Sequence, residues 1–327
     1  MRVLLTGANG FVGSHILDEL CERGIPTTIL LRKTSSTKFI SRRLNQARIV
    51  CGTLENPQSV EDALDGITHV IHCAGLVRAL NKEEFFRVNK GATRCLLDAV
   101  NKKQNCIKRF ILVSSLAASG PSEPGRPRKE DDAPEPVSAY GMSKLAAEIE
   151  VISNCRTEYT ILRPPGVYGP RDTEFLRLFK SIQSHLLPKI GSRQELSLVH
   201  VKDLAFVCVE SMYRENASGK IFFVASPQIT TSAALAKIIA EKLKTWTIPL
   251  YLPVQALFPV CFLQDIISKI TKKPDVLSLD KYNELRASAW TCDVSKLKTE
   301  LELICKTNLD EGIAQTIEWY KAEGWLK

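Results

Sequence analysis

The chain has 327 residues, 44% of them hydrophobic, and a formal net charge of +8. A chain of this length can bury a sizeable core, either as one large α/β domain or as two lobes. Its basic residues are spread along the sequence without a block of like charge, which argues against a nucleic-acid-binding protein.

Cysteine spacing and the first residues bear on metal binding and on location. The ten cysteines form no CxxC pair, so no metal site is expected, and they are typical of reduced thiols in a cytoplasmic protein. Met1 and Arg2 lead directly into a strand-like run, without the apolar stretch of an export signal.

Short apolar runs alternate with amphipathic stretches in the first half of the chain. Strands are expected at residues 3–6, 27–31, 48–51, 68–72, 109–114 and 160–163, with helices at 11–23, 83–105 and 138–154. This β-α-β-α order predicts an α/β fold with a doubly wound parallel (Rossmann) sheet.

Helical patterns dominate after Pro164 and end in a helix expected at residues 308–325, which predicts a smaller, mostly helical C-terminal substrate lobe. The dinucleotide-binding domain is expected to take residues 1–163, with 198–225 returning to it. The substrate lobe then comprises mainly residues 164–197 and 226–327.

Two segments stand out by composition. Residues 120–136 are rich in proline and charge, so they predict a surface loop. Residues 245–264 contain no charged side chain, and the favoured interpretation is a buried or mouth-lining part of the second lobe. A membrane-surface contact and a true span are the alternatives, and three prolines in the stretch argue against the span.

A glycine motif follows the first strand and opens the first helix. Gly7, Gly10 and Gly13 permit a tight turn, close approach of backbone N–H groups to a pyrophosphate and close helix packing. Asn9, Phe11 and Val12 complete the motif. Its place at the first βα junction predicts dinucleotide binding.

The end of the second strand indicates which dinucleotide is bound. An acidic residue there would accept hydrogen bonds from the ribose 2′-hydroxyl, but the sequence has Arg32 and Lys33. Two cations suit a 2′-phosphate, so NADP(H) is favoured and NAD(H) is the alternative.

Tyr140 and Lys144 lie four residues apart, on one face of a predicted helix. A phenol titrates near ~10 and is a poor acid or base at neutral pH, but a nearby ammonium is expected to lower its pKa. Ser115, at the end of the preceding strand, is expected to orient a substrate oxygen. Such a set suits proton transfer coupled to hydride transfer.

The ordered motifs resemble those of the extended short-chain dehydrogenase/reductase family, of the NAD-dependent epimerase/dehydratase type. They are TGANGFVG from Thr6, HCAG from His72, NKGAT from Asn89, VSS from Val113, YGMSK from Tyr140, LRP from Leu162, VYG from Val167 and VHVKD from Val199. The pattern of the C-terminal segment is closest to the branch that holds dihydroflavonol reductases and 3β-hydroxysteroid dehydrogenases.

The resemblance implies a role for each matching position. It makes Ser115, Tyr140 and Lys144 the catalytic triad and Asn89 the residue that supports a proton relay through water. It also implies a homodimer formed through the helices around residues 83–105 and 138–154. Further cofactor contacts are implied at Thr53, Leu54, Cys73, Ala74, Gly75, Pro164, Gly166 and Val167, with Val77 and Arg171 facing the substrate.

Two positions depart from the family pattern. Thr53 replaces an aspartate that would contact adenine, and Gly166 replaces the asparagine that nucleotide-sugar enzymes carry. The second departure favours a carbonyl reductase. Arg171 can be a contact for an anionic substrate group or an ordinary loop arginine, and His200 with Asp203 is expected to be structural.

The leading hypothesis is therefore an NADP(H)-dependent oxidoreductase that interconverts a carbonyl and an alcohol on a small, fairly apolar substrate. One alternative is a nucleotide-sugar epimerase or dehydratase with tightly bound NAD(P). A second alternative is a dinucleotide-binding sensor without turnover, which would have no need of the Ser115, Tyr140 and Lys144 set.

Overall fold

The structure, a computed structural model, describes residues 1–190, 194–271 and 278–327. A seven-stranded sheet has the order β11-β6-β5-β4-β1-β2-β3, and every neighbouring pair is parallel. Its strands are β1 (Val3–Thr6), β2 (Thr27–Leu31), β3 (Ala47–Cys51), β4 (His69–His72), β5 (Arg109–Val113), β6 (Glu158–Arg163) and β11 (Lys220–Phe223). The strand order reverses beside β1, which confirms the predicted doubly wound sheet.

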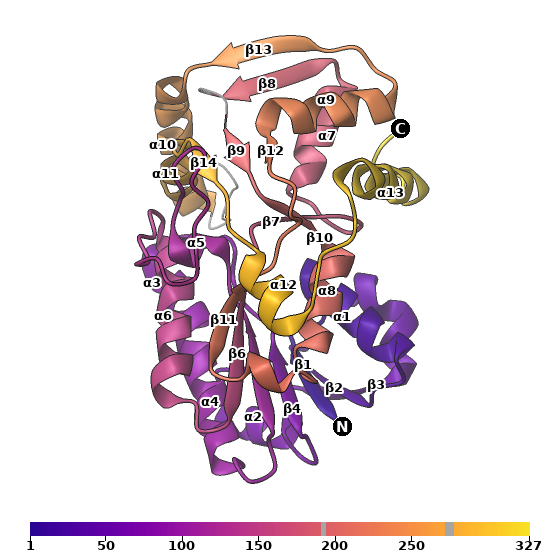
Figure 1. The fold of residues 1–327 in the computed structure, drawn as a ribbon, viewed down its shortest axis with the longest axis vertical. Coiled ribbons are helices and arrows are strands. Elements are labelled where there is room, and N and C mark those ends of the chain that lie inside the picture. The colour runs from indigo at the N-terminus through magenta and orange to yellow at the C-terminus, as the bar shows by residue number, and fades with distance from the viewer. Residues whose placement is uncertain (191–193, 272–277) are drawn as a thin grey trace.

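Helices cover both faces of this sheet (Figure 1). On one face α1 (Phe11–Glu22) packs against α8 (Val201–Glu210), so that Leu17 and Leu204 share one core with β1 and β2. On the other face α2 (Pro57–Ala63), α4 (Ala92–Lys102) and α6 (Ala139–Asn154) enclose a second core. Buried residues such as Leu96 and Ala147 face the sheet because their helices carry apolar side chains at helical spacing.

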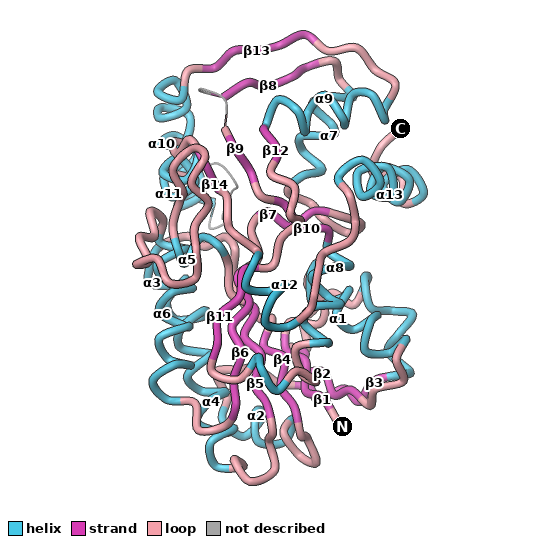
Figure 2. Tube along the Cα trace, in the orientation of Figure 1, coloured by secondary structure: helices cyan, strands magenta, loops and turns pink. Residues whose placement is uncertain are grey.

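The second lobe combines helices with short strands, as the secondary-structure colours of Figure 2 show. Three helices, α7 (Phe175–Gln183), α9 (Ser232–Leu243) and α13 (Leu309–Ala322), enclose a third core that includes Phe179, Ile239 and Tyr320. Its short strands are β7 (Gly166–Tyr168), β8 (Leu186–Ile190), β9 (Glu195–Leu196), β10 (Leu198–His200), β12 (Thr230–Thr231), β13 (Ile248–Leu252) and β14 (Ala289–Trp290).

The remaining elements are helices and turns outside these sets. They are α3 (Lys82–Phe85), a π-helical turn at Phe86–Gly91, α5 (Leu116–Ser119), α10 (Val254–Thr271), α11 (Leu279–Leu285) and α12 (Ser295–Leu301), with 3-10 turns at Lys38–Gln46 and Glu215–Ala217. Residues 120–136 contain no helix or named strand, and their isolated bridges join Ser122 to Ala289 and Arg128 to Cys292.

The expected burial of residues 245–264 is wrong for most of the stretch. It forms β13 and the first half of α10, where Leu257 and Cys261 are buried but Trp246, Tyr251 and Phe262 are exposed. The physical reason is that one side of an uncharged helix can pack against the protein while its other sides face solvent. In α10 only the narrow side with Leu257 and Cys261 is buried. Among the described residues, no helix combines the length and hydropathy needed to cross a bilayer.

Candidate active site

The glycine motif forms a backbone cradle at the carboxyl end of β1. Gly7 has φ +75°, and a Cβ added there would lie 2.7 Å from the Ala74 nitrogen. A Cβ on Gly13 would lie 2.0 Å from the Gly7 carbonyl oxygen. Only glycine fits both positions, and exposed Gly10 leaves the first turn of α1 open to an anion. The residues present therefore fit a dinucleotide pyrophosphate.

The other predicted cofactor positions follow neighbouring strands at the same edge of the sheet. Arg32 and Lys33 directly follow β2 beside the glycine turn. Both are exposed, and neither side chain forms an ion pair with a residue that the structure describes. Thr53 and Leu54 follow β3. The structure also brings Cys73, Ala74 and Gly75 after β4 and Pro164, Gly166 and Val167 after β6 to this edge.

The proton-transfer set meets where β5 ends and α6 begins. The Ser115 hydroxyl lies close enough to Tyr140 to lower the pKa of its phenol, and both residues are partly exposed. The two neighbouring serines have other surroundings: buried Ser114 donates to Glu148, and Ser119 is wholly buried. The structure thus places Ser115, of the three, beside Tyr140.

Lys144 contacts the carboxyl end of β5 in this structure. Its Nζ lies 2.7 Å from the Val113 carbonyl oxygen, to which it donates, and burial lowers its pKa. Burial raises the pKa of Tyr140 to about 12, against the opposing effect of the nearby Ser115 hydroxyl. The tyrosine is therefore protonated at neutral pH and ready to donate.

Asn89 positions the loop that follows β4. It lies in the π-helical turn, is almost fully buried, and its Oδ1 accepts from the Leu76 N–H at 2.7 Å. Its Nδ2 donates to the Leu76 carbonyl at 3.0 Å and to the Ser143 hydroxyl at 2.8 Å. These three bonds tie the cofactor-facing loop to α6 one turn from Tyr140.

A buried polar chain behind the glycine turn was not assigned from the sequence. His72 Nδ1 lies 2.7 Å from Thr6 Oγ1, and His72 Nε2 lies 3.0 Å from Thr93 Oγ1. Thr93 donates to the Asn89 carbonyl, so His72 must carry its proton on Nε2 and accept from Thr6 at Nδ1. Both motifs were visible in the sequence, but their pairing across 21 residues was not.

Helix α11 of the second lobe caps the catalytic helix. Asp280 accepts from the N–H groups of Ala139 and Tyr140, and Glu284 accepts from the Ser138 hydroxyl at 2.8 Å. Carboxylates at a helix N-terminus stabilise its unpaired N–H groups. No sequence motif marks these contacts, because they join residues about 140 positions apart.

The other end of α6 is anchored by a buried ion pair. Arg163, the last residue of β6, lies 2.6 Å from Glu148, and their side chains are 4% and 0% exposed. Ser114 donates to the same carboxylate. This group fixes α6 against the carboxyl ends of β5 and β6.

The two predicted substrate positions differ in their surroundings. Val77 is exposed in the loop after β4. Arg171 has φ 73° and pairs with Asp18 of α1 at 2.7 Å, so its charge is already engaged. His200 is buried, and neither of its ring nitrogens has a partner within the described part of the chain.

Four buried histidines make the free energy of unfolding depend on pH. Burial lowers the pKa of His15, His69 and His200 to about 4 and that of His72 to about 3. Their unfolded forms bind protons near pH 6.5, so the unfolded state takes up more protons between pH 4 and 6.5. Burial raises the pKa of Asp172 to about 7, which opposes this effect by about one proton. We expect the free energy of unfolding to fall by about 4 kcal/mol per pH unit near pH 5.

Urea titrations at pH 7.5, 6 and 5 measure this dependence. His200→Asn should reduce the slope by about one of the four protons that the histidines take up, because its imidazole has no partner to lose. A slope that is unchanged in this variant would contradict the assignment.

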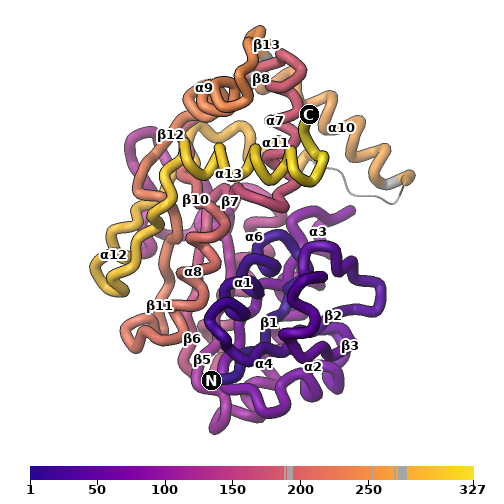
Figure 3. Tube along the Cα trace, turned by 90° about the vertical axis from the view of Figure 1, so that its right-hand side faces the viewer, coloured from indigo at the N-terminus to yellow at the C-terminus, as the bar shows by residue number. Residues whose placement is uncertain are grey.

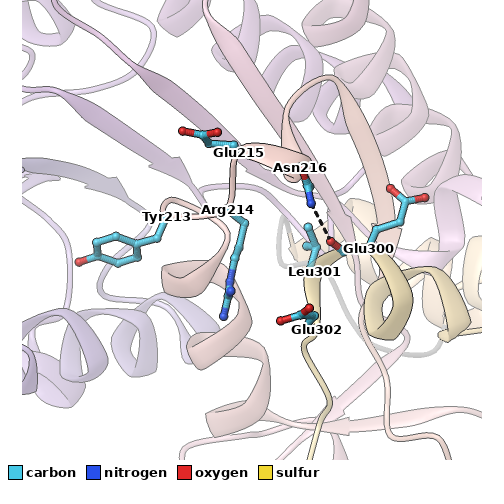
Figure 4. Close-up of a pocket in the computed structure, with 7 residues that line it drawn as sticks. All are labelled: Tyr213, Arg214, Glu215, Asn216, Glu300, Leu301 and Glu302. Atoms are coloured by element: carbon cyan, nitrogen blue, oxygen red, sulfur yellow. Dashed lines mark hydrogen bonds between the residues drawn. The ribbon is translucent and has the colours of Figure 1, made fainter.

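A solvent-facing pocket lies away from this site, between the end of α8 and α12 (Figure 4). It contains none of the predicted site residues, and its lining is mostly polar: Tyr213, Arg214, Glu215, Asn216, Glu300, Leu301 and Glu302. In the described ranges, no group of three or more His, Cys, Asp or Glu side chains could hold a metal ion.

Fold and site together define a dinucleotide-binding oxidoreductase of the extended short-chain dehydrogenase/reductase type. Residues 3–225 match the NAD dependent epimerase/dehydratase family, and the chain belongs to that family. The chain is 31% identical to a ceramide reductase of Caulobacter vibrioides over 99% of its own length and 96% of the relative's.

Other similarities span the chain as completely. A UDP-glucose 4-epimerase of Vibrio cholerae is 25% identical over 97% of this chain and 94% of the relative. The solved structure of gox2253 superposes with a TM-score of 0.83 at 23% identity, covering 100% of this chain and 99% of that one. The last comparison supports the fold alone.

Proposed function

We propose that the protein is an NADP(H)-dependent reductase or dehydrogenase that interconverts a carbonyl and an alcohol on a small, fairly apolar substrate. The observation that carries the proposal is the Ser115–Tyr140 hydroxyl pair beside buried Lys144, at the sheet edge that holds the glycine cradle. The nicotinamide, when bound, supplies or accepts the hydride.

The chain's own residues handle the oxygen and the proton. Ser115 hydrogen-bonds the substrate oxygen, and Tyr140 donates its proton to that oxygen in reduction or takes it back in oxidation. Lys144, on the same helix as Tyr140, donates to the Val113 carbonyl at the end of β5. Asn89 holds the loop at Leu76 and, through Ser143, the first turns of α6.

Two observations favour a carbonyl substrate over a nucleotide sugar. Arg171 is held against α1 by its ion pair with Asp18, which makes it less free to meet a diphosphate. Position 166 is glycine, not asparagine. The name of the 31% identical relative, a ceramide reductase, makes a lipid carbonyl the comparison to test beside small apolar carbonyls.

The cofactor preference is tested by fluorescence titration with NADPH and NADH. Arg32→Ala removes a guanidinium that suits a 2′-phosphate, and a charge-assisted hydrogen bond contributes about 1.5–3 kcal/mol. We expect NADPH to bind about 10–100-fold more weakly to the variant, with NADH affinity nearly unchanged.

The same titration separates the alternatives. If wild type prefers NADH, or retains a tightly bound cofactor through purification and shows no net NADPH oxidation with any carbonyl, the epimerase or dehydratase alternative gains. A protein that binds the cofactor but turns over neither substrate class would support the sensor.

We also propose a homodimer through α4 and α6. Ile149 and Ile152 lie one turn apart on α6, and their side chains are 52% and 47% exposed. Replacing both by glutamate should convert a dimer into a monomer in light scattering, whereas Ile304→Glu, at another exposed isoleucine, should not. A monomeric wild type would refute this proposal.

A further inference from the structure

The end of the molecule opposite the seven-stranded sheet carries an uncovered apolar surface. In both Figure 1 and Figure 3, β13 and α10 lie at this end. Their exposed side chains, here called the apolar face, are Trp246, Ile248, Leu250, Tyr251, Phe258, Val260, Phe262, Leu263, Ile266, Ile267 and Ile270. A patch of this kind marks a binding surface, since isolated apolar residues are the normal case.

Helix α10 packs one narrow side against the protein and exposes a broad apolar side. Leu257, Cys261 and Ser268 are buried on the side that contacts α11, and Asp265 accepts from the Leu279 N–H there. Phe258, Phe262, Ile266 and Ile270 recur every four residues along the outer side.

Basic residues flank the apolar face in sequence. Residues 242–273 contain five lysines and one acidic residue, Asp265, and all five lysines stand at the two ends of the stretch. Lys189 Nζ lies 3.3 Å from the Tyr251 hydroxyl and 4.9 Å from its ring centroid. Trp246 stacks on His185, with ring centroids 4.1 Å apart.

We propose that this apolar face is a membrane-surface contact that inserts shallowly into a bilayer with anionic headgroups. Apolar side chains enter the acyl boundary, Trp246 and Tyr251 lie at headgroup level, and Lys189 beside Tyr251 meets the negative surface. A second copy of this chain is a poorer occupant, because pairing the two faces would bring their basic ends together.

The position of the apolar face gives this contact a consequence for the site. Phe258 of α10 packs on Tyr282 of α11, with ring centroids 5.5 Å apart, and α11 caps the helix that carries Tyr140. The bilayer contact is therefore separated from the proton-transfer residues by a single helix. Vesicle binding is measured without substrate, so its result does not depend on whether the enzyme turns over.

The test is co-flotation of the full chain with vesicles of phosphatidylcholine alone and of phosphatidylcholine mixed with phosphatidylglycerol. Wild type should float with the mixed vesicles, and added salt should weaken its binding. Phe262→Glu/Ile266→Glu should lower the bound fraction at least tenfold. Ile304→Glu, an exposed isoleucine outside the apolar face, is the matched control and should bind like wild type.

Fluorescence locates the contact within the chain. Vesicles should shift the emission of wild type to shorter wavelength, and Trp246→Phe should remove the shift although three other tryptophans remain. NADPH affinity and circular dichroism should be unchanged in all variants, which excludes unfolding as the cause.

Three outcomes would overturn the proposal. The first is that wild type floats with neither kind of vesicle, and the second is that the double variant floats like wild type. The third is that light scattering shows wild type as an oligomer and the double variant as a monomer, which would assign the apolar face to contact with a second copy.

Discussion

Tyr140→Phe is expected to lower kcat by about 10²–10⁴-fold while leaving NADPH affinity nearly unchanged. The variant loses only the hydroxyl that lies beside Ser115, and its ring can still pack against Phe85, whose centroid is 6.0 Å away. The proton then has no donor beside the substrate oxygen. Steady-state kinetics with NADPH and the best carbonyl substrate measure the loss.

Ser115→Ala provides the comparison within the same pair. It should lower kcat less than Tyr140→Phe, because the remaining tyrosine can still deliver its proton to a less well oriented oxygen. If Tyr140→Phe retained more than a tenth of the activity, another group would have to be the acid. A loss of NADPH binding in that variant would instead point to a structural role.

Glu148→Ala is expected to destabilise the protein by about 3–5 kcal/mol, because it leaves the buried guanidinium of Arg163 without its partner. Ser114 also loses its acceptor. Urea unfolding at pH 7.5 measures the change. Glu150→Ala is the matched control, since its partner Arg94 is about half exposed, and it should cost less than about 1 kcal/mol.

A loss below 1 kcal/mol for Glu148→Ala would mean that water reaches Arg163 after the substitution. Glu148→Gln should lie between the two variants, because the amide oxygen can accept one hydrogen bond but carries no charge. These three values together separate the contribution of charge from that of packing.

Local signals in the sequence predict the first lobe well. Buried parallel strands and the glycine turn depend on residues close together in the chain, so β1, β2 and α6 appear within one residue of their expected bounds. Tyr140 and Lys144 share one helix, and their proximity follows from the helical repeat. The order of parallel strands then places Ser115 beside them.

Contacts between distant segments lie beyond such reasoning. The capping of α6 by Asp280 and the pairing of His72 with Thr93 have no local pattern. The pKa of Tyr140 depends on how much solvent the fold removes from its phenol, which the sequence does not show. The exposed apolar side of α10 departs from the expectation that an uncharged segment is buried. The amino-acid composition of the segment does not show which side of the helix is exposed.

The catalytic helix is attached to two different bodies. Its C-terminal half is fixed to the sheet through Glu148 and Arg163, whereas its first turn is held by Asp280 and Glu284 of the second lobe. If the two lobes moved apart, the hydrogen bonds between α11 and the first turn of α6 would have to break. Tyr140 lies in that first turn, so the position of its hydroxyl depends on how the two lobes are arranged.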